Sequence, residues 1–254
     1  MTLVLPYGVI WFSAFYAYDK LQAYARKVRS STEGRQFKLV ANGVRILAWG
    51  LALQVIIALI LSAIAGARPH FKGSATVLNH YIMVIISLLG FTSIAAGTRA
   101  LIDSIHVRPG RIASHVLGIG FIAFGVLFSH LAIRNSSGAG SPYHLSVYPL
   151  MFTVVVPHLY VWFLGFMSAW ELQLYARWVK GVLFRQALRK LASGIAIVIT
   201  ASIAVQFLTG VYTGNAANSL GSLLIVVYLL LTIQAAGYVL IAFGAKQLKK
   251  IEEV

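Results

Sequence analysis

Five polar side chains fall near the middle of long apolar segments, and they are the residues of this chain best placed to bind a ligand. They are Gln54, Thr92, His158, Gln206 and Gln234. Polar residues within lipid-spanning segments usually face the interior of a helix bundle or a water-filled path, because lipid offers them no hydrogen-bond partner. Amide, hydroxyl and imidazole groups can hydrogen-bond a neutral or weakly polar solute. The set therefore predicts a path for such a solute.

A repeated motif adds aromatic residues to this path. The pattern Pro-(Tyr/His)-x3-Trp-Phe occurs at residues 6–12 and again at 157–163. Proline weakens a helix and frees a backbone carbonyl, and the Trp lies one turn beyond the Tyr or His, on the same helix face. If the two copies are arranged around a common axis, the tyrosine of one faces the histidine of the other. The predicted path therefore also includes Tyr7, Trp11 and Trp162, next to His158.

Histidines suggest an alternative chemistry, the binding of a b-type haem or a metal ion. A b-type haem needs two imidazoles from different helices at a similar depth. His80 and His130 match in depth near one end of the predicted spans, and His158 lies deeper. The alternative function is therefore a redox membrane subunit that binds haem or quinone through His130 together with His80 or His158.

Other chemistries are excluded by what the sequence lacks. It contains no cysteine, which removes thiol catalysis, disulfides and thiolate metal sites. No lysine lies in the apolar part of a predicted span, so retinal has no attachment point. The chain also lacks a phosphate-binding loop, an HExxH pair and a nucleophile elbow. A role other than catalysis is therefore favoured.

Composition indicates the elements that must position these residues. Of 254 residues, 59% are hydrophobic and 11% charged, whereas soluble domains average about 25% charged. Mean hydropathy is +0.82, so we expect helices in lipid, each satisfying its own backbone hydrogen bonds. The prediction is a single all-α domain over residues 1–254 with seven transmembrane helices. They lie at about 3–18, 44–66, 81–101, 113–133, 146–170, 191–213 and 219–245.

The basic residues predict the topology of these spans. Of 21 lysines and arginines, all but Arg68, Lys72 and Arg134 fall on one side of the predicted membrane. Basic loops stay in the cytoplasm, which predicts an N-out, C-in arrangement in the plasma membrane of a prokaryote. The net charge of +15 then reflects topology and contact with anionic lipid head groups. We expect no nucleic-acid partner, whereas other membrane subunits or a homo-oligomer are compatible with the sequence.

An internal repeat divides the predicted spans into two groups. Residues 6–28 and 157–179 align without a gap and share ten identities in 23 positions. The third and seventh spans match at a smaller offset of 140. The prediction is a parallel 3+1+3 repeat, with repeat A at about 3–101, a linker helix at about 113–133 and repeat B at about 146–245. The matches at this second offset are Thr92/Thr232, Ala95/Ala235, Ala96/Ala236 and Gly97/Gly237.

This plan resembles that of the SWEET and PQ-loop transporters, although the chain contains no Pro-Gln pair. The resemblance implies a transporter or channel whose solute passes between the repeats. A further alternative is a seven-span sensor or the membrane anchor of a larger complex. For each of these functions, the cytoplasmic ends of the two copies of the repeated segment carry predicted lipid-interface anchors, which are Tyr24, Arg26, Tyr175 and Arg177. Asp19 and Glu171 are expected to pair with neighbouring basic residues.

Overall fold

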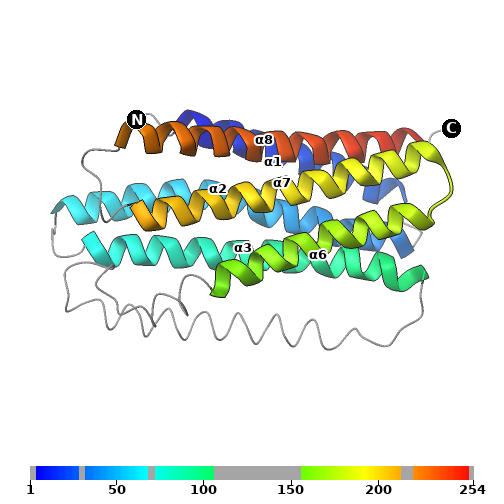
Figure 1. The fold of residues 1–254 in the computed structure, drawn as a ribbon, viewed down its shortest axis with the longest axis horizontal. Coiled ribbons are helices and arrows are strands. Elements are labelled where there is room, and N and C mark those ends of the chain that lie inside the picture. Colours follow the sequence, from blue (N-terminus) through cyan, green and yellow to red (C-terminus); the bar gives the residue numbers. More distant parts are fainter. Residues whose placement is uncertain (1–3, 29–31, 68–71, 106–155, 213–219, 252–254) are drawn as a thin grey trace.

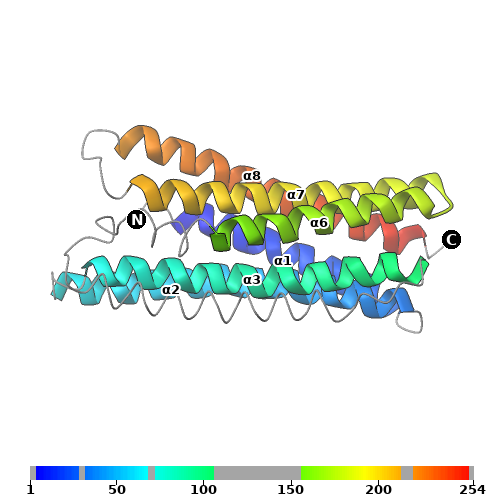
Figure 2. The ribbon, with the colours of Figure 1, turned by 60° about the horizontal axis from the view of Figure 1, so that its bottom comes forward.

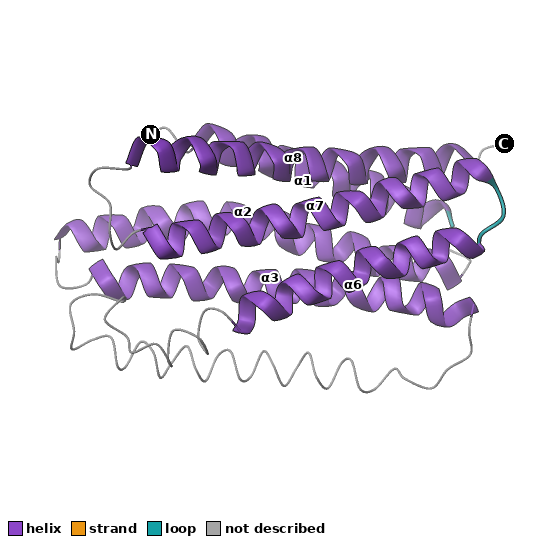
Figure 3. Ribbon diagram, in the orientation of Figure 1, coloured by secondary structure: helices purple, strands orange, loops and turns teal. Residues whose placement is uncertain are grey.

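The protein is helical throughout the part of the chain that the structure describes. This computed structural model describes residues 4–28, 32–67, 72–105, 156–212 and 220–251 (Figure 1). Within these ranges no strand occurs (Figure 3). The helices are α1 (Val4–Lys27), α2 (Thr32–Ala67), α3 (Lys72–Ile105), α6 (Val156–Trp178), α7 (Val182–Tyr212) and α8 (Leu220–Ile251).

Four of these helices are long and apolar enough to cross a membrane, and together they indicate an α-helical integral membrane protein. Large apolar side chains such as Trp49, Leu59 and Ile225 are exposed on the surface of the bundle, where lipid can cover them. Within the described residues the candidate spans are Thr32–Ile57, Ile82–Ser104, Val182–Val205 and Ile225–Ile251. They correspond to the predicted spans 44–66, 81–101, 191–213 and 219–245.

The remaining predicted spans are only partly represented. The span 3–18 lies in α1 and the later part of the span 146–170 lies in α6, but neither helix is among the four apolar candidates. Both carry charged residues towards their C-terminal ends. The predicted linker span 113–133 lies outside the described residues. A seven-span count therefore stays a prediction.

The helices lie side by side along one long axis, and their basic ends coincide (Figure 1). The last turns of α1, α6 and α8 hold basic residues, and all three turns lie at the end marked by the C-terminus in Figure 1. We call this the basic end. A short turn joins α6 to α7 here, and Gly181 adopts a φ of 109° in it, which costs glycine little because it has no side chain.

Helix contacts follow a pattern that is unchanged when α1–α3 and α6–α8 exchange places. α1 packs on α2 as α6 packs on α7, and α2 packs on α3 as α7 packs on α8. The contact of α1 with α8 matches that of α6 with α3. Each pair in this description has its exchanged counterpart. Figure 2 shows α2 and α3 together on one side of the bundle and α7 with α8 on the other.

Glycines produce matching close approaches in α2–α3 and in α7–α8. A Cβ added at Gly43 would lie 2.5 Å from the carbonyl oxygen of Gly90, and one added at Gly194 would lie 2.6 Å from that of Gly237. Further along, a Cβ at Gly97 would lie 2.7 Å from the carbonyl of Gln36. Its match is Gly244, 2.7 Å from the carbonyl of Ala187. Only glycine allows backbones this close in a helical membrane bundle.

These contacts make positions in α3 equivalent to positions in α8 at an offset of 147 residues, whereas the sequence comparison gives an offset of 140. Gly90 occupies the place of Gly237 and Gly97 that of Gly244. The sequence comparison instead matches Gly97 with Gly237. Both helices carry two glycines seven residues apart, so a shift of seven residues still aligns one pair of glycines. Contacts with α2 and α7 distinguish the two registers, and a comparison of α3 and α8 alone does not.

Candidate functional site

Tyr7, Trp11 and Gln54 form a polar group between α1 and α2. Tyr7 and Trp11 lie one turn apart on α1, and the Tyr7 hydroxyl is hydrogen-bonded to the side chain of Gln54 on α2. Tyr7 and Trp11 also pack against the apolar core. The structure thus brings together three residues of the predicted path.

Two polar atoms of this group are buried without a hydrogen-bond partner in the described part of the protein. They are the indole Nε1 of Trp11, a donor, and Oε1 of Gln54, an acceptor. Buried polar atoms in native proteins are almost always hydrogen-bonded to protein or ordered water, so such atoms indicate a place for a bound water or ligand. Water or a small solute can supply a partner to each atom.

Thr92 on α3 adds a further unpaired atom to the first three helices. Its Oγ1 is buried and has no hydrogen-bond partner among the described residues. The segments of α1 and α2 that hold Tyr7, Trp11 and Gln54, residues 4–18 and 46–66, contain no charged residue. The group is therefore suited to a neutral or weakly polar molecule.

The second half of the predicted path lies on α6, α7 and α8. His158 is buried at the beginning of α6, and Gln234 on α8 is buried with its Nε2 donating to Ser202 Oγ at 3.4 Å. Gln206 lies in α7, but its side chain is outside the described part. These residues are in α6–α8, whereas Tyr7, Gln54 and Thr92 are in α1–α3.

The exposure of Trp162 differs from the expected position inside the path, and a second expected relation stays a prediction. Trp162 is 41% exposed and packs on Phe166, with ring centroids 4.4 Å apart, so a large part of its ring lies at the surface. α1 and α6 are not among the major helix pairs, and the described hydrogen bond of Tyr7 is to Gln54. The pairing of Tyr7 with His158 across an axis stays a prediction.

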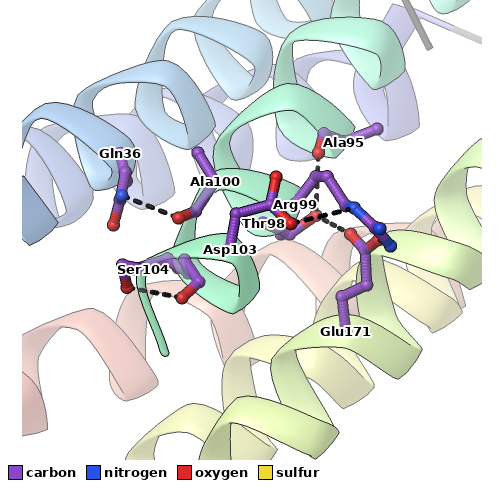
Figure 4. Close-up of polar contacts among 9 residues, drawn as sticks. Gln36, Ala95, Thr98, Arg99, Ala100, Asp103, Ser104 and Glu171 are labelled. Carbon is purple, nitrogen blue, oxygen red and sulfur yellow. Dashed lines mark hydrogen bonds and ion pairs between the residues drawn. The ribbon is translucent and has the colours of Figure 1, made fainter. Parts of the chain in front are cut away.

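A second polar group, which sequence reasoning did not predict, joins α3 to α6 near the basic end. Glu171 is only 6% exposed and accepts hydrogen bonds from Thr98 Oγ1 at 2.8 Å and from Arg99 Nη1 at 3.3 Å (Figure 4). Arg99 Nε also lies 3.4 Å from Asp103 Oδ1. This group holds a buried carboxylate between the two sets of three helices.

α2 is connected to the same region through two contacts. Gln36 Nε2 donates to the carbonyl of Ala100 at 2.8 Å, and the Tyr175 hydroxyl donates to Glu33 Oε1. Tyr175 lies beyond the predicted span 146–170, and its pKa is raised by burial first, then by the Glu33 carboxylate and by neighbouring Tyr24. The Tyr175 proton therefore stays on the hydroxyl and links α6 to α2.

The structure places the four predicted lipid-interface anchors in two different environments. Arg26 and Arg177 are exposed, and Arg177 lies 6.0 Å from the ring of Trp170. Tyr24 and Tyr175 are buried, at 0% and 2% exposed, because the faces that carry them pack into the bundle. An anchoring role stays a prediction for the arginines, whereas the tyrosines lie in the core.

The haem and metal prediction rests mainly on side chains outside the described part. His130 lies outside the described residues, and His80 lies in α3 with its side chain not described. Among the described residues, no three His, Cys, Asp or Glu side chains group to hold a metal ion. Haem binding by His80, His130 or His158 stays a prediction.

Comparisons with known proteins return no relative: no family model, curated protein or solved structure matches this chain. Its function is therefore argued from its own residues.

Proposed function

We propose that this integral membrane protein is a transporter or channel for a small neutral or weakly polar solute. The observation that carries the proposal is the buried donor of Trp11 and the buried acceptor of Gln54, next to Tyr7 in an uncharged part of the bundle. Both atoms need hydrogen-bond partners that the described protein does not supply. Water or a solute entering the bundle supplies them.

We further propose that the solute passes between two equivalent units, α1–α3 and α6–α8. The exchangeable helix contacts and the matching glycine approaches support this 3+1+3 repeat. Repeats of this kind place a binding site at their interface, and one unit rocks against the other to give alternating access. The path has Tyr7, Gln54 and Thr92 on one unit and His158 and Gln234 on the other.

In this proposal the basic end faces the cytoplasm of a prokaryotic cell, as the distribution of lysine and arginine favours. Glu171, Thr98 and Arg99 then join the two units at the cytoplasmic end. Opening there requires that α3 and α6 separate.

Solute entry into proteoliposomes tests the proposed function. Vesicles with the wild-type chain, Gln54→Leu or Leu53→Ala are challenged with urea, glycerol and a monosaccharide, and light scattering follows swelling. We expect at least one solute to enter faster than into protein-free vesicles. Gln54→Leu should slow that entry about fivefold, as expected for one lost hydrogen bond, and Leu53→Ala on the exposed face should not. Equal rates in wild-type and protein-free vesicles for every solute would contradict the proposal.

Cysteine cross-linking tests the repeat and its register, since the chain has no cysteine of its own. Ser93 Oγ donates to the carbonyl of Leu39 at 2.9 Å. The offset of 147 matches Ser93 to Leu240, and the offset of 151 that relates residues 6–28 to 157–179 matches Leu39 to Lys190. Leu240 and Lys190 line one groove. The pairs Leu39→Cys/Ser93→Cys and Lys190→Cys/Leu240→Cys should both form disulfides. A register of 140 predicts instead a disulfide in Lys190→Cys/Ile233→Cys, the outcome that overturns the offset of 147.

A further inference from the structure

A cationic groove lies between α7 and α8 at the basic end. It is a shallow, open groove with a volume of about 310 Å³, the lower end of the range for small-molecule sites. Three lysines and two apolar residues dominate its lining, and none of the lining residues is acidic. The lining residues are Lys190, Leu240, Phe243, Lys246, Gln247 and Lys250.

The polar contacts of the groove hold one lysine in place and leave two available. Lys190 Nζ donates to Gln247 Oε1 at 2.9 Å, and Gln247 Nε2 donates to the carbonyl of Leu183 at 3.4 Å. Lys246 and Lys250 are exposed, and neither forms an ion pair within the described part of the chain. The groove therefore presents positive charge that a ligand can neutralise.

Charged and apolar parts of the groove follow one another along α8. Phe243 is 50% exposed and lies about one turn before Lys246, on the side of the candidate span Ile225–Ile251 nearer the middle of the membrane. A ligand that fits has an anionic head beside the lysines and an apolar tail along Phe243 and Leu240. The volume of the open groove suits a head group, with the acyl chains outside in the lipid.

We propose that this groove is a binding site for an anionic phospholipid. Basic pockets between transmembrane helices at the cytoplasmic face bind such head groups. The proposal goes beyond general attraction of the basic end to lipid, because it assigns the phosphate to Lys190, Lys246 and Lys250 and the start of a chain to Phe243. It does not depend on transport.

Lipid binding to the full-length protein in neutral detergent tests the site. Native mass spectrometry measures binding of phosphatidylglycerol and phosphatidylcholine to the wild type, to Lys246→Gln/Lys250→Gln, and to Lys180→Gln/Arg189→Gln. The last variant removes equal charge from exposed positions outside the groove. At about fivefold for each of the two lysines, the groove variant should bind phosphatidylglycerol about 25-fold more weakly, with unchanged melting in detergent alone. Equal losses in both variants, or none in the groove variant, overturn the site.

A second comparison separates a lipid from a free anion. Phe243→Ala should weaken phosphatidylglycerol binding and leave protection by inorganic phosphate unchanged. If inorganic phosphate raises the melting temperature of the wild type as much as phosphatidylglycerol does, and Phe243→Ala changes neither, the groove binds an anion and the lipid proposal is wrong.

Discussion

The basic ends of α2–α3 and α7–α8 are packed alike and charged differently. In both pairs, glycines bring the backbones so close that an added Cβ would lie 2.5–2.7 Å from a carbonyl oxygen of the other helix. The α2–α3 pair then meets α6 through Arg99, Asp103 and Glu171. At the same offsets the α7–α8 side has Lys246, Lys250 and Lys20.

This difference shows which residues determine how the helices pack and which determine the charge at their ends. Small residues fix how two helices pack, and they are the same in both pairs. The three positions that hold Arg99, Asp103 and Glu171 on one side hold lysines on the other, so an ion-paired contact on one side corresponds to an excess of positive charge on the other. One packing arrangement thus supplies a contact between units in one place and a proposed lipid site in the other.

The largest expected effect comes from filling the glycine contacts. Gly43→Ala and Gly194→Ala should each destabilise the protein by about 2 kcal/mol, because a Cβ overlaps the backbone of the facing helix and forces the pair apart. Thermal or denaturant unfolding in detergent measures this. Gly8→Ala is the control, since a Cβ there meets nothing within 4 Å. A large loss for one substitution and none for the other would break the comparison.

The next effect compares Glu171, at the contact of α3 with α6, with Lys20 at the matching position of α1. Glu171→Ala should cost about 2 kcal/mol, because it removes a buried carboxylate that accepts charge-assisted and hydroxyl hydrogen bonds from Arg99 and Thr98. Thr98 keeps its bond to the Ala95 carbonyl and Arg99 keeps its contact with Asp103. Lys20→Ala, at the matching place, should cost less than about 0.5 kcal/mol, since its contact with Asp19 is at the surface. Glu171→Gln should fall between them. Equal losses for Glu171→Ala and Lys20→Ala would count against a buried junction at α3–α6.

The buried polar group of α1 and α2 could be predicted from the sequence only where it depended on residue type and depth. Gln54, Tyr7 and Trp11 stand out because an uncharged apolar segment gives polar groups few reasons to occur. Trp162 was expected inside the path but is half-exposed. The sequence did not reveal this, because apolar residues surround α6 and its motif does not indicate which face turns inward.

Contacts between distant helices were not predictable in the same way. The partners of Glu171 depend on how α3 packs against α6, 72 or 73 residues away along the chain. The alignment of α3 with α8 as repeat copies was ambiguous because each helix has two glycines seven residues apart. Tyr24 and Tyr175 have the composition of interface anchors, but the faces that bear them are buried by packing that no local pattern indicates.

The smallest expected effect concerns a hydroxyl of α3 that donates to the backbone of α2. Ser93→Ala removes the hydrogen bond to the Leu39 carbonyl and should cost about 0.6 kcal/mol, typical of such bonds between helices in membranes. Ser13→Ala is the control, because its bond to Val9 lies within α1. Unfolding in detergent compares the two, and a control loss as large as that of Ser93→Ala would assign no stability to the contact.

The central claim, that water or solute reaches Gln54 inside the bundle, is tested most directly by cysteine accessibility. Gln54→Cys and the neighbouring Leu53→Cys, whose native side chain is 45% exposed on the lipid-facing surface, are treated in membranes with a charged, membrane-impermeant thiol reagent. A thiol in contact with water forms the reactive thiolate more readily than one in lipid, so Gln54→Cys should react about tenfold faster or more. If Gln54→Cys reacts no faster than Leu53→Cys, the buried polar group is sealed and the proposed path does not exist.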